Sequence, residues 1–501
     1  MRKSGILLHI SSLPSPYGIG TLGKSAYEFI DFIKTSGFSM WQMLPTVPTG
    51  FGDSPYQSVS AFAGNPYFID PEMLFEMGLL TKDELIFARP LNDDGYVDYG
   101  FLYQTRPKLL KLSCERLDIS NDKDFSRFVE ENRSWLLDYA AYMAFCEHFS
   151  SLPWYMWEDR KAALHDEIIE DRLSDALKSS ILMYKKQQYL YDIQWRALHA
   201  YAKKRGITII GDMPIYTSLD SADVWANRAE FMLDEKGKPK GVAGVPPDYF
   251  SSTGQLWGNP LYDYEHMSKN GFGWWKYRMK HALMRFDMVR IDHFRAFASY
   301  YCVPFGAKTA AEGIWLPGPG KAFFDAVFEE DCDRDSIIAE TLGIIDESVN
   351  KLCKDCGFYD MAVLEFAFDS DAKNLHLPHN CTKRRVMYTG THDNDTAEGF
   401  YLSASERAIS YMKRYLDTSE KSFSRAFIKA AMLSVCDIAI IPMQDVLGLK
   451  SNARMNIPGT SSGNWRWRLS PSYRDNKEAM AAMLKLNEIS GRTGDDAEPF
   501  L

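Results

Sequence analysis

The stretch "MVRIDHFRA", residues 288–296, joins a short apolar run to an arginine, an aspartate and a histidine. Side chains alternate between the two faces of a strand, so Arg290 and Asp292 would share one face. Val289, Ile291 and His293 would share the other face, which can pack on helices. Burying a cation beside a carboxylate is costly unless the two charges are matched or functional. The stretch therefore predicts a strand that ends in either an ion pair or a functional site.

Seven other apolar runs end in the same way, at polar or glycine-bearing segments. These runs begin at Gly5, Ser39, Ile207, Ser336, Met361, Val386 and Ile438. Helical patterns lie between most of them, such as "AYEFIDFIKTSG" (26–37) and "KAFFDAVFEE" (321–330). Strands that alternate with helices predict parallel pairing, and eight such units predict a (β/α)8 TIM barrel over residues 1–501. In that α/β fold the chemistry lies at the carboxyl ends of the strands.

Two long intervals between strands predict insertions, since each is longer than a crossover requires. Residues 71–188 are mostly amphipathic and predict an inserted helical subdomain. Residues 217–272 are rich in Gly, Pro and aromatic side chains, as in "GVAGVPPDYFSSTGQLWGNPLYDY" (241–264). This many aromatic residues argue against a disordered linker. The insertion is therefore interpreted as a loop-rich lid subdomain.

The amino-acid composition argues against some classes of binding partner and indicates a cellular compartment. The net charge of −10 argues against nucleic acid or anionic membranes as partners. No apolar run approaches the ~20 residues of a membrane span, and "MRKSGILLHISSLP" at the start reads as a strand rather than a signal peptide. Eight scattered cysteines indicate free thiols in a reducing compartment, so a cytoplasmic protein is expected. The pair "CKDC" (353–356) lacks the second pair of a zinc ribbon and is interpreted as two ordinary cysteines.

Three acids follow strands and would converge at the mouth of the barrel: Asp292, Glu340 and Asp393. Converging carboxylates suit either a divalent metal or acid–base and nucleophilic work at an acetal carbon. His293 and His392 keep the metal alternative open, because transition metals usually recruit more than one histidine.

Glycoside chemistry fits these residue types more closely than metal binding does. A nucleophilic Asp292 must stay ionised, and Arg290 on the same strand face supplies the cation. Glu340 follows the apolar "SIIA", a setting that favours a carboxylic acid able to hold its proton near neutral pH. Asp393 would then accept hydrogen bonds from sugar hydroxyls as the ring approaches an oxocarbenium-like state.

"MVRIDHFRAF" (288–297), "IIAETLG" (337–343) and "YTGTHDNDT" (388–396) resemble the catalytic blocks of the 4-α-glucanotransferases. This is the amylomaltase or disproportionating-enzyme family of the α-amylase superfamily. Further blocks that resemble the family are "SSLPSPYGIGTLG" (11–23), "FGDSPYQSVSAFAGNPYFID" (51–70), "IIGDMPIY" (209–216) and "GTSSGNWRWR" (459–468). Classical α-amylases have an Asn-His pair where this chain has "GDMPIY", and "GNWRWRLS" (463–470) near the end predicts no separate C-terminal β-domain. Both departures favour the glucanotransferase branch.

The resemblance implies a retaining double displacement on α-1,4-glucans, without a cofactor or metal. Asp292 would form the glucosyl-enzyme, Glu340 would act as acid and then base, and Asp393 would stabilise the transition state. Arg290 would hold Asp292, His392 would contact sugar hydroxyls, and His293 and Asp212 would support substrate or neighbouring carboxylates. The further residues expected at the glucan are the lid aromatics Tyr249, Phe250 and Trp257 on the acceptor side, Asn464 and Trp465 in the cleft, and Tyr56, which has an equally good structural interpretation.

The expected substrates are maltooligosaccharides, amylose or glycogen, with glucose as an acceptor, and the expected state is a monomer or weak homo-oligomer. Three alternatives remain at this point. A hydrolase of α-glucans would share the catalytic residues but pass the glucosyl group to water. A non-catalytic glucan-binding protein is expected to lack one of the acids, and a metal-dependent barrel enzyme would lose activity with a chelator.

Overall fold

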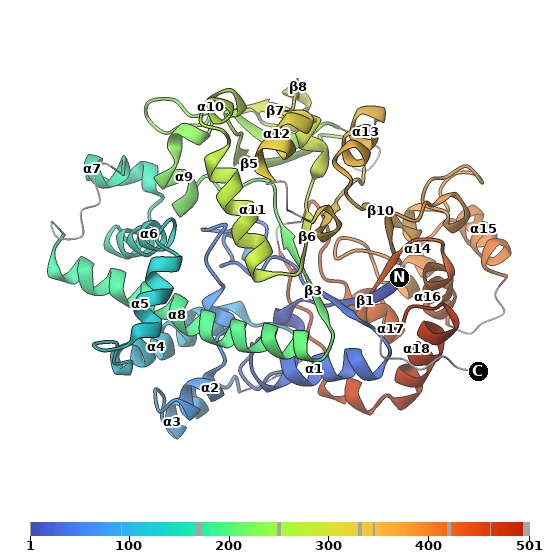
Figure 1. The fold of residues 1–501 in the computed structure, drawn as a ribbon, viewed down its shortest axis with the longest axis horizontal. Coiled ribbons are helices and arrows are strands. Elements are labelled where there is room, and N and C mark those ends of the chain that lie inside the picture. The colour runs from blue at the N-terminus through green and yellow to red at the C-terminus, as the bar shows by residue number, and fades with distance from the viewer. Residues whose placement is uncertain are drawn as a thin grey trace.

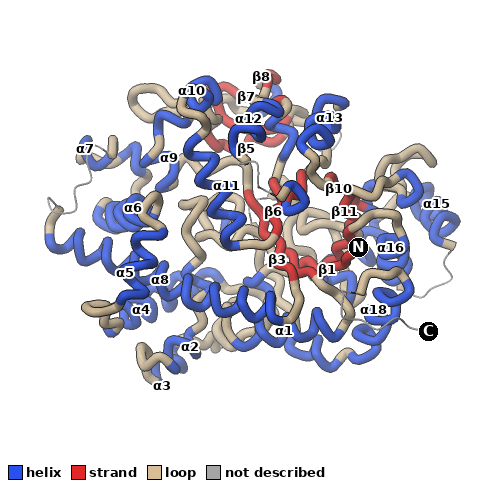
Figure 2. The backbone as a smooth tube through the Cα atoms, viewed as in Figure 1, coloured by secondary structure: helices blue, strands red, loops and turns tan. Residues whose placement is uncertain are grey.

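Eight short strands form one curved parallel sheet, in the order β10-β11-β12-β1-β2-β3-β6-β9 (Figures 1 and 2). The computed structural model describes residues 2–91, 93–165, 173–247, 252–328, 333–343, 346–417, 422–460 and 462–493. The strands of this sheet are β1 (Lys3–Leu7), β2 (Met40–Gln42), β3 (Thr208–Met213), β6 (Met288–Ile291), β9 (Ile337–Ala339), β10 (Asp360–Val363), β11 (Arg385–Tyr388) and β12 (Ile438–Pro442). Each of the eight predicted runs overlaps one of them, although β1, β10 and β11 begin one or two residues before the run.

The two edges of this sheet meet and close it into a barrel. Ala339 N–H donates to the Tyr359 carbonyl at 2.8 Å, and Tyr359 N–H donates to the Ile337 carbonyl at 3.1 Å. A parallel bridge between Ile338 and Tyr359 completes the contact between β9 and the start of β10. The predicted (β/α)8 barrel is thereby confirmed.

Burial explains why the sequence of these strands is so apolar. Every residue of the eight strands is buried except the first residues Lys3, Thr208, Asp360 and Arg385. Parallel sheets covered by helices are buried on both faces, so their strands are nearly continuous apolar runs. The polar starts of four strands mark the amino end of the barrel, opposite the end expected to carry the chemistry.

Helices surround the barrel and extend to one side of it (Figure 1). Those outside the predicted helical insertion are α1 (Lys24–Thr35), α9 (Ala222–Ala226), α10 (Tyr264–Lys269), α11 (Gly273–Arg285), α12 (Gly320–Val327), α13 (Glu347–Cys356), α14 (Ala397–Ser403), α15 (Glu406–Leu416), α16 (Phe423–Leu433), α17 (Met443–Val446) and α18 (Lys477–Ile489). No helix of the described residues is long and apolar enough to cross a membrane.

The predicted insertion at residues 71–188 contains helices that lie on the left in Figure 1. These are α2 (Pro71–Glu76), α3 (Lys82–Phe87), α4 (Tyr99–Arg116), α5 (Lys123–Glu131), α6 (Leu136–His148), α7 (Arg160–Ala163) and the first part of α8 (Asp175–Lys204). Helix α8 crosses residue 188 without a break and leads directly to β3. One helix therefore belongs both to the side structure and to the crossover of the barrel, and the domain boundary stays a prediction.

A second sheet lies beside the barrel mouth, at the top of Figure 2. Its antiparallel order is β5-β4-β7-β8. The strands are β4 (Gly241–Val245), β5 (Gln255–Pro260), β7 (Ser299–Pro304) and β8 (Ile314–Pro317). The first two lie in the segment predicted to be loop-rich, and the other two follow β6. Gly and Pro disfavour strands, so the sequence pattern hid β4 and β5, which form because each has a hydrogen-bonding neighbour in this sheet.

A buried arginine joins the first and last strands of the barrel at their amino ends. Arg492 donates from Nη1 to the Lys3 carbonyl at 2.8 Å and from Nη2 to the Cys436 carbonyl at 2.8 Å. Its Nε donates to the Met432 carbonyl, also at 2.8 Å. The segment after α18 is therefore fastened to both β1 and the turn before β12.

Candidate active site

Arg290 on β6 links two carboxylates at the carboxyl end of the barrel. Its Nη1 donates to Asp212 Oδ1 and Oδ2 at 2.8 and 2.9 Å and to Asp292 Oδ1 at 2.9 Å. Asp212 lies opposite Arg290 in the β3–β6 register. The Arg290 and Asp212 side chains are 6% and 0% exposed, whereas Asp292 is 27% exposed. Asp212 is thus the buried partner of Arg290, and Asp292 is the one that solvent or a ligand can reach.

The charges in this group are strongly coupled. Burial alone lowers the pKa of Arg290, but the carboxylates of Asp212 and Asp292 outweigh burial and raise its pKa well above the ordinary value. Burial raises the pKa of Asp212, and the Arg290 guanidinium opposes that rise. Buried charges are tolerated when they are paired and hydrogen-bonded, as these are.

Glu340 follows β9 and is held by backbone N–H groups. His293 N–H donates to Glu340 Oε2 and Leu342 N–H donates to Oε1, each at 2.8 Å. His293 has φ 48° and ψ 47°, the left-handed region that residues other than glycine seldom adopt. Strand β6 ends at Ile291, so the predicted alternation of faces does not reach His293. The left-handed turn lies where the backbone of the Asp292 segment contacts the Glu340 carboxyl.

The surroundings of Glu340 raise its pKa to about 7. Burial is the main cause and the negative charge of Asp292 adds to it, while Arg290 and the two backbone N–H groups act in the opposite direction. A carboxyl group with a pKa near neutrality can both give and take a proton, which general acid–base catalysis requires.

Asp393, after β11, is held by a second loop. Asn456 Nδ2 donates to Asp393 Oδ1 at 2.6 Å, and Arg454 Nη2 donates to the Asp393 carbonyl at 2.5 Å. His392 Nε2 lies 3.4 Å from Asp393 Oδ1. The Asp393 side chain is 48% exposed, so one side of this carboxylate remains open.

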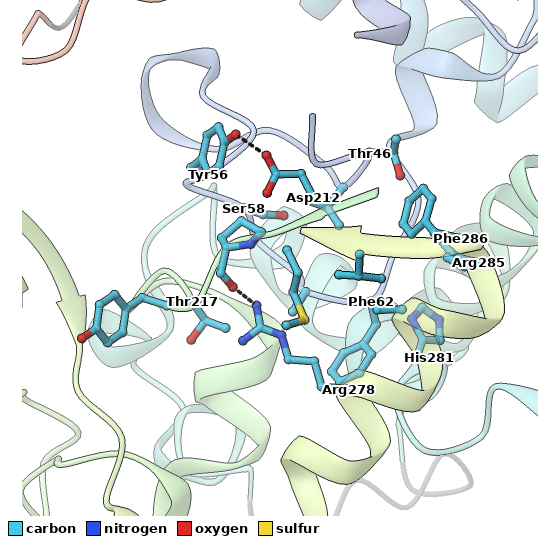
Figure 3. A pocket seen from close by; sticks show the side chains of 17 residues that line it. Thr46, Tyr56, Ser58, Phe62, Asp212, Thr217, Arg278, His281, Arg285 and Phe286 are labelled. Atoms are coloured by element: carbon cyan, nitrogen blue, oxygen red, sulfur yellow. Dashed lines mark hydrogen bonds between the residues drawn. The ribbon is translucent and has the colours of Figure 1, made fainter. Parts of the chain in front are cut away.

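Tyr56 connects the Arg290 group with His392. Its hydroxyl donates to Asp212 Oδ2 at 2.7 Å, the contact drawn in Figure 3. Its ring stacks on His392 with centroids 5.1 Å apart and planes 17° apart. The Trp465 ring lies 5.8 Å from each of these two rings. The predicted residues Tyr56, His392 and Trp465 therefore form one aromatic wall.

The remaining predicted residues differ in their placement. Trp257 on β5 meets the His293 ring edge-on, with centroids 4.8 Å apart. Asn464 accepts a hydrogen bond from Ile457 N–H at 3.0 Å and donates to the Thr460 carbonyl at 3.2 Å, so its amide shapes its own loop. Tyr249 and Phe250 lie outside the described residues.

A small cavity of about 50 Å³ lies beside Asp212 (Figure 3). Its lining includes Tyr56, Thr217, Arg278 and His281. Arg278 Nη1 donates to the Ile215 carbonyl at 2.8 Å, and Nη2 donates to the Pro214 carbonyl. This volume suits a few water molecules rather than a sugar ring.

Metal binding was the alternative use of converging acids. Within the ranges that the structure describes, no three His, Cys, Asp or Glu side chains are grouped so as to hold a metal ion. The expectation that no metal or cofactor is needed stays a prediction.

A protein-family model described as 4-alpha-glucanotransferase matches residues 8–474. The chain belongs to this family. A 4-alpha-glucanotransferase of Streptococcus pneumoniae is 44% identical over 471 residues, which cover 93% of each chain. One of Thermus thermophilus is 44% identical over 482 residues, 94% of this chain and 95% of the relative. An amylomaltase from Streptococcus agalactiae, solved in complex with acarbose, superposes with a TM-score of 0.94 at 36% identity, covering 99% and 100% of the two chains.

These matches confirm the family that the sequence blocks indicated. The chain is a glycosyltransferase of the 4-alpha-glucanotransferase class, whose members act on α-1,4-glucans by a retaining double displacement. The likeness to the amylomaltase from Corynebacterium glutamicum, with a TM-score of 0.78 at 17% identity, supports the barrel fold.

Sequence reasoning missed two residues that hold the third carboxylate of this glucanotransferase. Asn456 and Arg454 lie in "RMNIPG" (454–459), a segment without strand or helix periodicity. Arg454 also donates from Nε to the Asn456 carbonyl at 2.7 Å. The only local signal was the Pro-Gly pair, which marks a turn but does not say what the turn contacts.

A second group of acids at strand ends was not predicted from the sequence. Glu365, Asp395 and Asp445 follow β10, β11 and β12. Asp445 accepts from Thr389 Oγ1 at 2.5 Å and from Ala397 N–H at 2.8 Å. Burial raises the pKa of Asp445 to about 6. Burial, Asp445 and Asp395 together raise the pKa of Glu365 well above its ordinary value.

Proposed function

We propose that the double displacement of this family runs on Asp292, Glu340 and Asp393 in this chain. The observation that carries the proposal is the contrast between the first two acids. Asp292 contacts the Arg290 cation and is partly exposed, whereas Glu340 is buried with a pKa of about 7. His293, next to Asp292 in the chain, donates its N–H to Glu340, so the two acids are held together. An ionised carboxylate and a proton-holding carboxyl are the two groups that a retaining mechanism needs.

In the first step, Asp292 Oδ attacks the anomeric carbon of the donor glucan. The bond between that carbon and the glycosidic oxygen breaks, and Glu340 gives its proton to the leaving oxygen. A covalent glucosyl-enzyme and a shortened glucan result. Arg290 holds Asp292 and compensates its charge before the attack.

In the second step, Glu340 is a carboxylate and takes the proton of the acceptor 4-hydroxyl. The acceptor oxygen bonds to the anomeric carbon while the bond to Asp292 breaks, so the configuration is retained. Asp393, fixed on one side by Asn456, accepts hydrogen bonds from sugar hydroxyls that strengthen as the ring flattens. His392 contacts hydroxyls of the same sugar.

The residues around these three acids orient them and the glucan. Asp212 and Tyr56 keep Arg290 in place through the contacts described above. Trp257 and Trp465 offer aromatic faces on which a sugar ring can pack. The further residues proposed to contact glucan are His293, Tyr249, Phe250 and Asn464.

Transfer wins over hydrolysis when the acceptor site is filled and water is excluded. We propose that Tyr249, Phe250 and Trp257 form a cover over the acceptor side of the cleft. Trp257 supports this role because its ring lies edge-on against His293, one residue after Asp292.

The donors are maltooligosaccharides, amylose or glycogen, and glucose serves as an acceptor. The protein works as a monomer or weak homo-oligomer in the cytoplasm. The seven cysteines that lie in the described ranges are all free thiols, which supports a reducing compartment.

The test is to incubate the purified protein with maltotriose and to separate the products over time. The expected result is a ladder of longer maltooligosaccharides together with glucose, with little net gain of reducing ends. Added glucose should increase the yield of short transfer products. A steady rise in reducing ends without longer products would instead show a hydrolase.

A further inference from the structure

Two cysteines far apart in the sequence meet at the amino end of the barrel. Cys381 lies in the loop before β11, and Cys436 lies in the turn before β12. Asp437 N–H donates to the Lys383 carbonyl at 2.7 Å, so the two segments run side by side into adjacent strands. Each thiol lies close enough to the other to shift its pKa, and the Arg385 guanidinium acts on both.

The two sulfur atoms have different surroundings. Cys381 is half-buried, contacts the Leu377 carbonyl at 3.4 Å, and lies 4.0 Å from Arg385 Nη1. Cys436 is fully buried. The Cys436 thiol and the Arg385 guanidinium lower the pKa of Cys381 to about 7, whereas contact with Cys381 and burial raise the pKa of Cys436. A thiolate next to a cation is the reactive form of cysteine, and a neighbouring thiol can resolve its oxidation product.

We propose that Cys381 and Cys436 are a thiol pair that a hydroperoxide oxidises to a reversible disulfide. The inference rests on the hydrogen bond that holds the two cysteine segments side by side before adjacent strands, and on the guanidinium beside the more exposed thiol. It does not depend on which residues carry out glucan transfer.

The chemistry needs one equivalent of hydrogen peroxide as the oxidant. The Cys381 thiolate attacks one peroxide oxygen, the S–O bond forms as the O–O bond breaks, and the departing hydroxide takes a proton to become water. Cys436 then loses its proton and attacks the Cys381 sulfenic sulfur. The S–S bond forms, the S–O bond breaks, and a second water leaves. Two thiols and one peroxide thus give one disulfide and two waters, and a dithiol reductant reverses the change.

The pair Cys353 and Cys356 provides a matched control in the same chain. Its C-x-x-C spacing is the one that sequence patterns associate with redox chemistry. Both thiols are buried on α13, however, and burial raises the pKa of each. The structure therefore predicts that the pair with the motif is inert and that the pair without a motif reacts.

Oxidation should stabilise the protein without changing its activity. The disulfide would close a loop from residue 381 to residue 436 and restrict the unfolded chain, so the Tm should rise by a few degrees. The pair lies before β11 and β12, whereas the candidate catalytic acids follow strands at the opposite end of the barrel. We expect kcat for glucan transfer to change by less than about 2-fold.

The experiment treats the full-length protein with about one equivalent of hydrogen peroxide and maps its peptides without reduction. The expected product is a peptide pair joined through Cys381 and Cys436, two hydrogen atoms lighter than the reduced pair and separated again by a dithiol. Cys353→Ser should form the same product. Cys381→Ser should form none, and Cys436→Ser should leave a sulfenic acid that a dimedone-type reagent traps at Cys381.

The wild-type peptide map decides the question even if the Cys436 variant folds poorly. A link between Cys353 and Cys356, a link from either thiol of the proposed pair to any other cysteine, or unreacted Cys381 would each overturn the proposal. Oxidation of Cys381 directly to sulfinic acid, with no disulfide formed, would also overturn it, because it would show that Cys436 does not resolve the intermediate.

Discussion

The carboxyl ends of β3, β6 and β9 carry acids grouped around Arg290, whereas those of β10 and β12 carry two other buried acids, Glu365 and Asp445. Asp212 and Asp292 both bond the same guanidinium. Asp445 bonds Thr389 and a backbone N–H, and Glu365 Oε1 has no hydrogen-bond partner among the described residues. Both groups lie at the carboxyl ends of barrel strands.

The difference teaches that acids at equivalent strand ends can have very different electrostatic surroundings. Glu340 has a pKa of about 7, so both its protonated and its ionised form are populated at neutral pH. Glu365 has its pKa raised well above the ordinary value by burial and by two neighbouring acids. We therefore interpret Glu365 as a neutral group of the core. Substitutions in the group around Arg290 should therefore affect activity differently from substitutions of Glu365 or Asp445.

The largest effect on activity is expected for Asp292→Asn, in the group of acids around Arg290. The amide cannot form the glucosyl-enzyme, so kcat for maltotriose disproportionation should fall by about 10⁴-fold or more. The Tm and the affinity for maltooligosaccharides, measured by calorimetry, should stay close to those of the wild type. Activity within about 10-fold of wild type would remove Asp292 from the mechanism.

Glu340→Gln should have the next largest effect and can be compared directly with Glu365→Gln. We expect kcat/KM to fall by about 10²- to 10⁴-fold, because neither proton transfer can occur. Wild-type kcat/KM should decline as the pH rises above about 7, since Glu340 must be protonated to act as an acid. A full pH profile checks both statements. A wild-type profile that stays flat through that range would contradict the role of Glu340.

Asn456→Ala probes the support of the third carboxylate and should have a moderate effect. Loss of a hydrogen bond to a charged group is worth about 1.5 to 3 kcal/mol, which corresponds to roughly a 10- to 100-fold fall in kcat. KM should change less than kcat, because the role proposed for Asp393 is to stabilise the transition state. Asn270→Ala is the control, since Asn270 makes an exposed hydrogen bond to Glu230. Equal effects of the two variants would indicate that Asn456 does not position Asp393.

Glu365→Gln should hardly change activity but should change how stability depends on pH. The pKa of Glu365 is raised in the folded protein. Its contribution to folding stability is therefore fully present below the unfolded-state pKa of about 4.3 and is lost as the pH rises through the folded-state pKa. The neutral amide removes this loss, so the variant should gain stability relative to wild type at about pH 8 compared with about pH 5. Thermal unfolding at both pH values measures the difference. A fall in kcat like that of Glu340→Gln would show that the two groups of acids do not differ in function.

The smallest effect is expected from metal removal. Dialysis against a chelator should leave the rate of maltotriose disproportionation unchanged, because the proposed chemistry uses only carboxyl groups and a guanidinium. Recovery of a lost rate by one particular divalent ion would favour metal use by one of the two groups of acids.

The barrel could be predicted because its physical cause is visible in the sequence. Strands buried on both faces must be apolar along their length, and "ITIIGDM" (207–213) or "IAIIP" (438–442) show this directly. The small antiparallel sheet could not be predicted in the same way. Strand β4 is the segment Gly241–Val245, and its identity as a strand comes from its neighbours β5 and β7 rather than from its own residues.

The candidate site shows the same division. Asp292, Glu340 and Asp393 could be chosen because each follows a strand or belongs to a block that resembles the family. Asn456 could not be chosen, because only the folded chain brings its loop to Asp393. The left-handed turn at His293 was also hidden, since the sequence around it continues an apparent strand pattern.

The position of β1 between β12 and β2 sets the order in which a newly made chain can fold. Strand β1 leaves the ribosome first, but its neighbour β12 begins at Ile438, and Arg492, which fastens both strands, comes later still. At about 5 to 20 residues per second, synthesis delivers β12 roughly 20 to 90 s after β1. During that interval one edge of β1 has no partner, so a nascent chain should need chaperone protection of its first strand until the last one arrives.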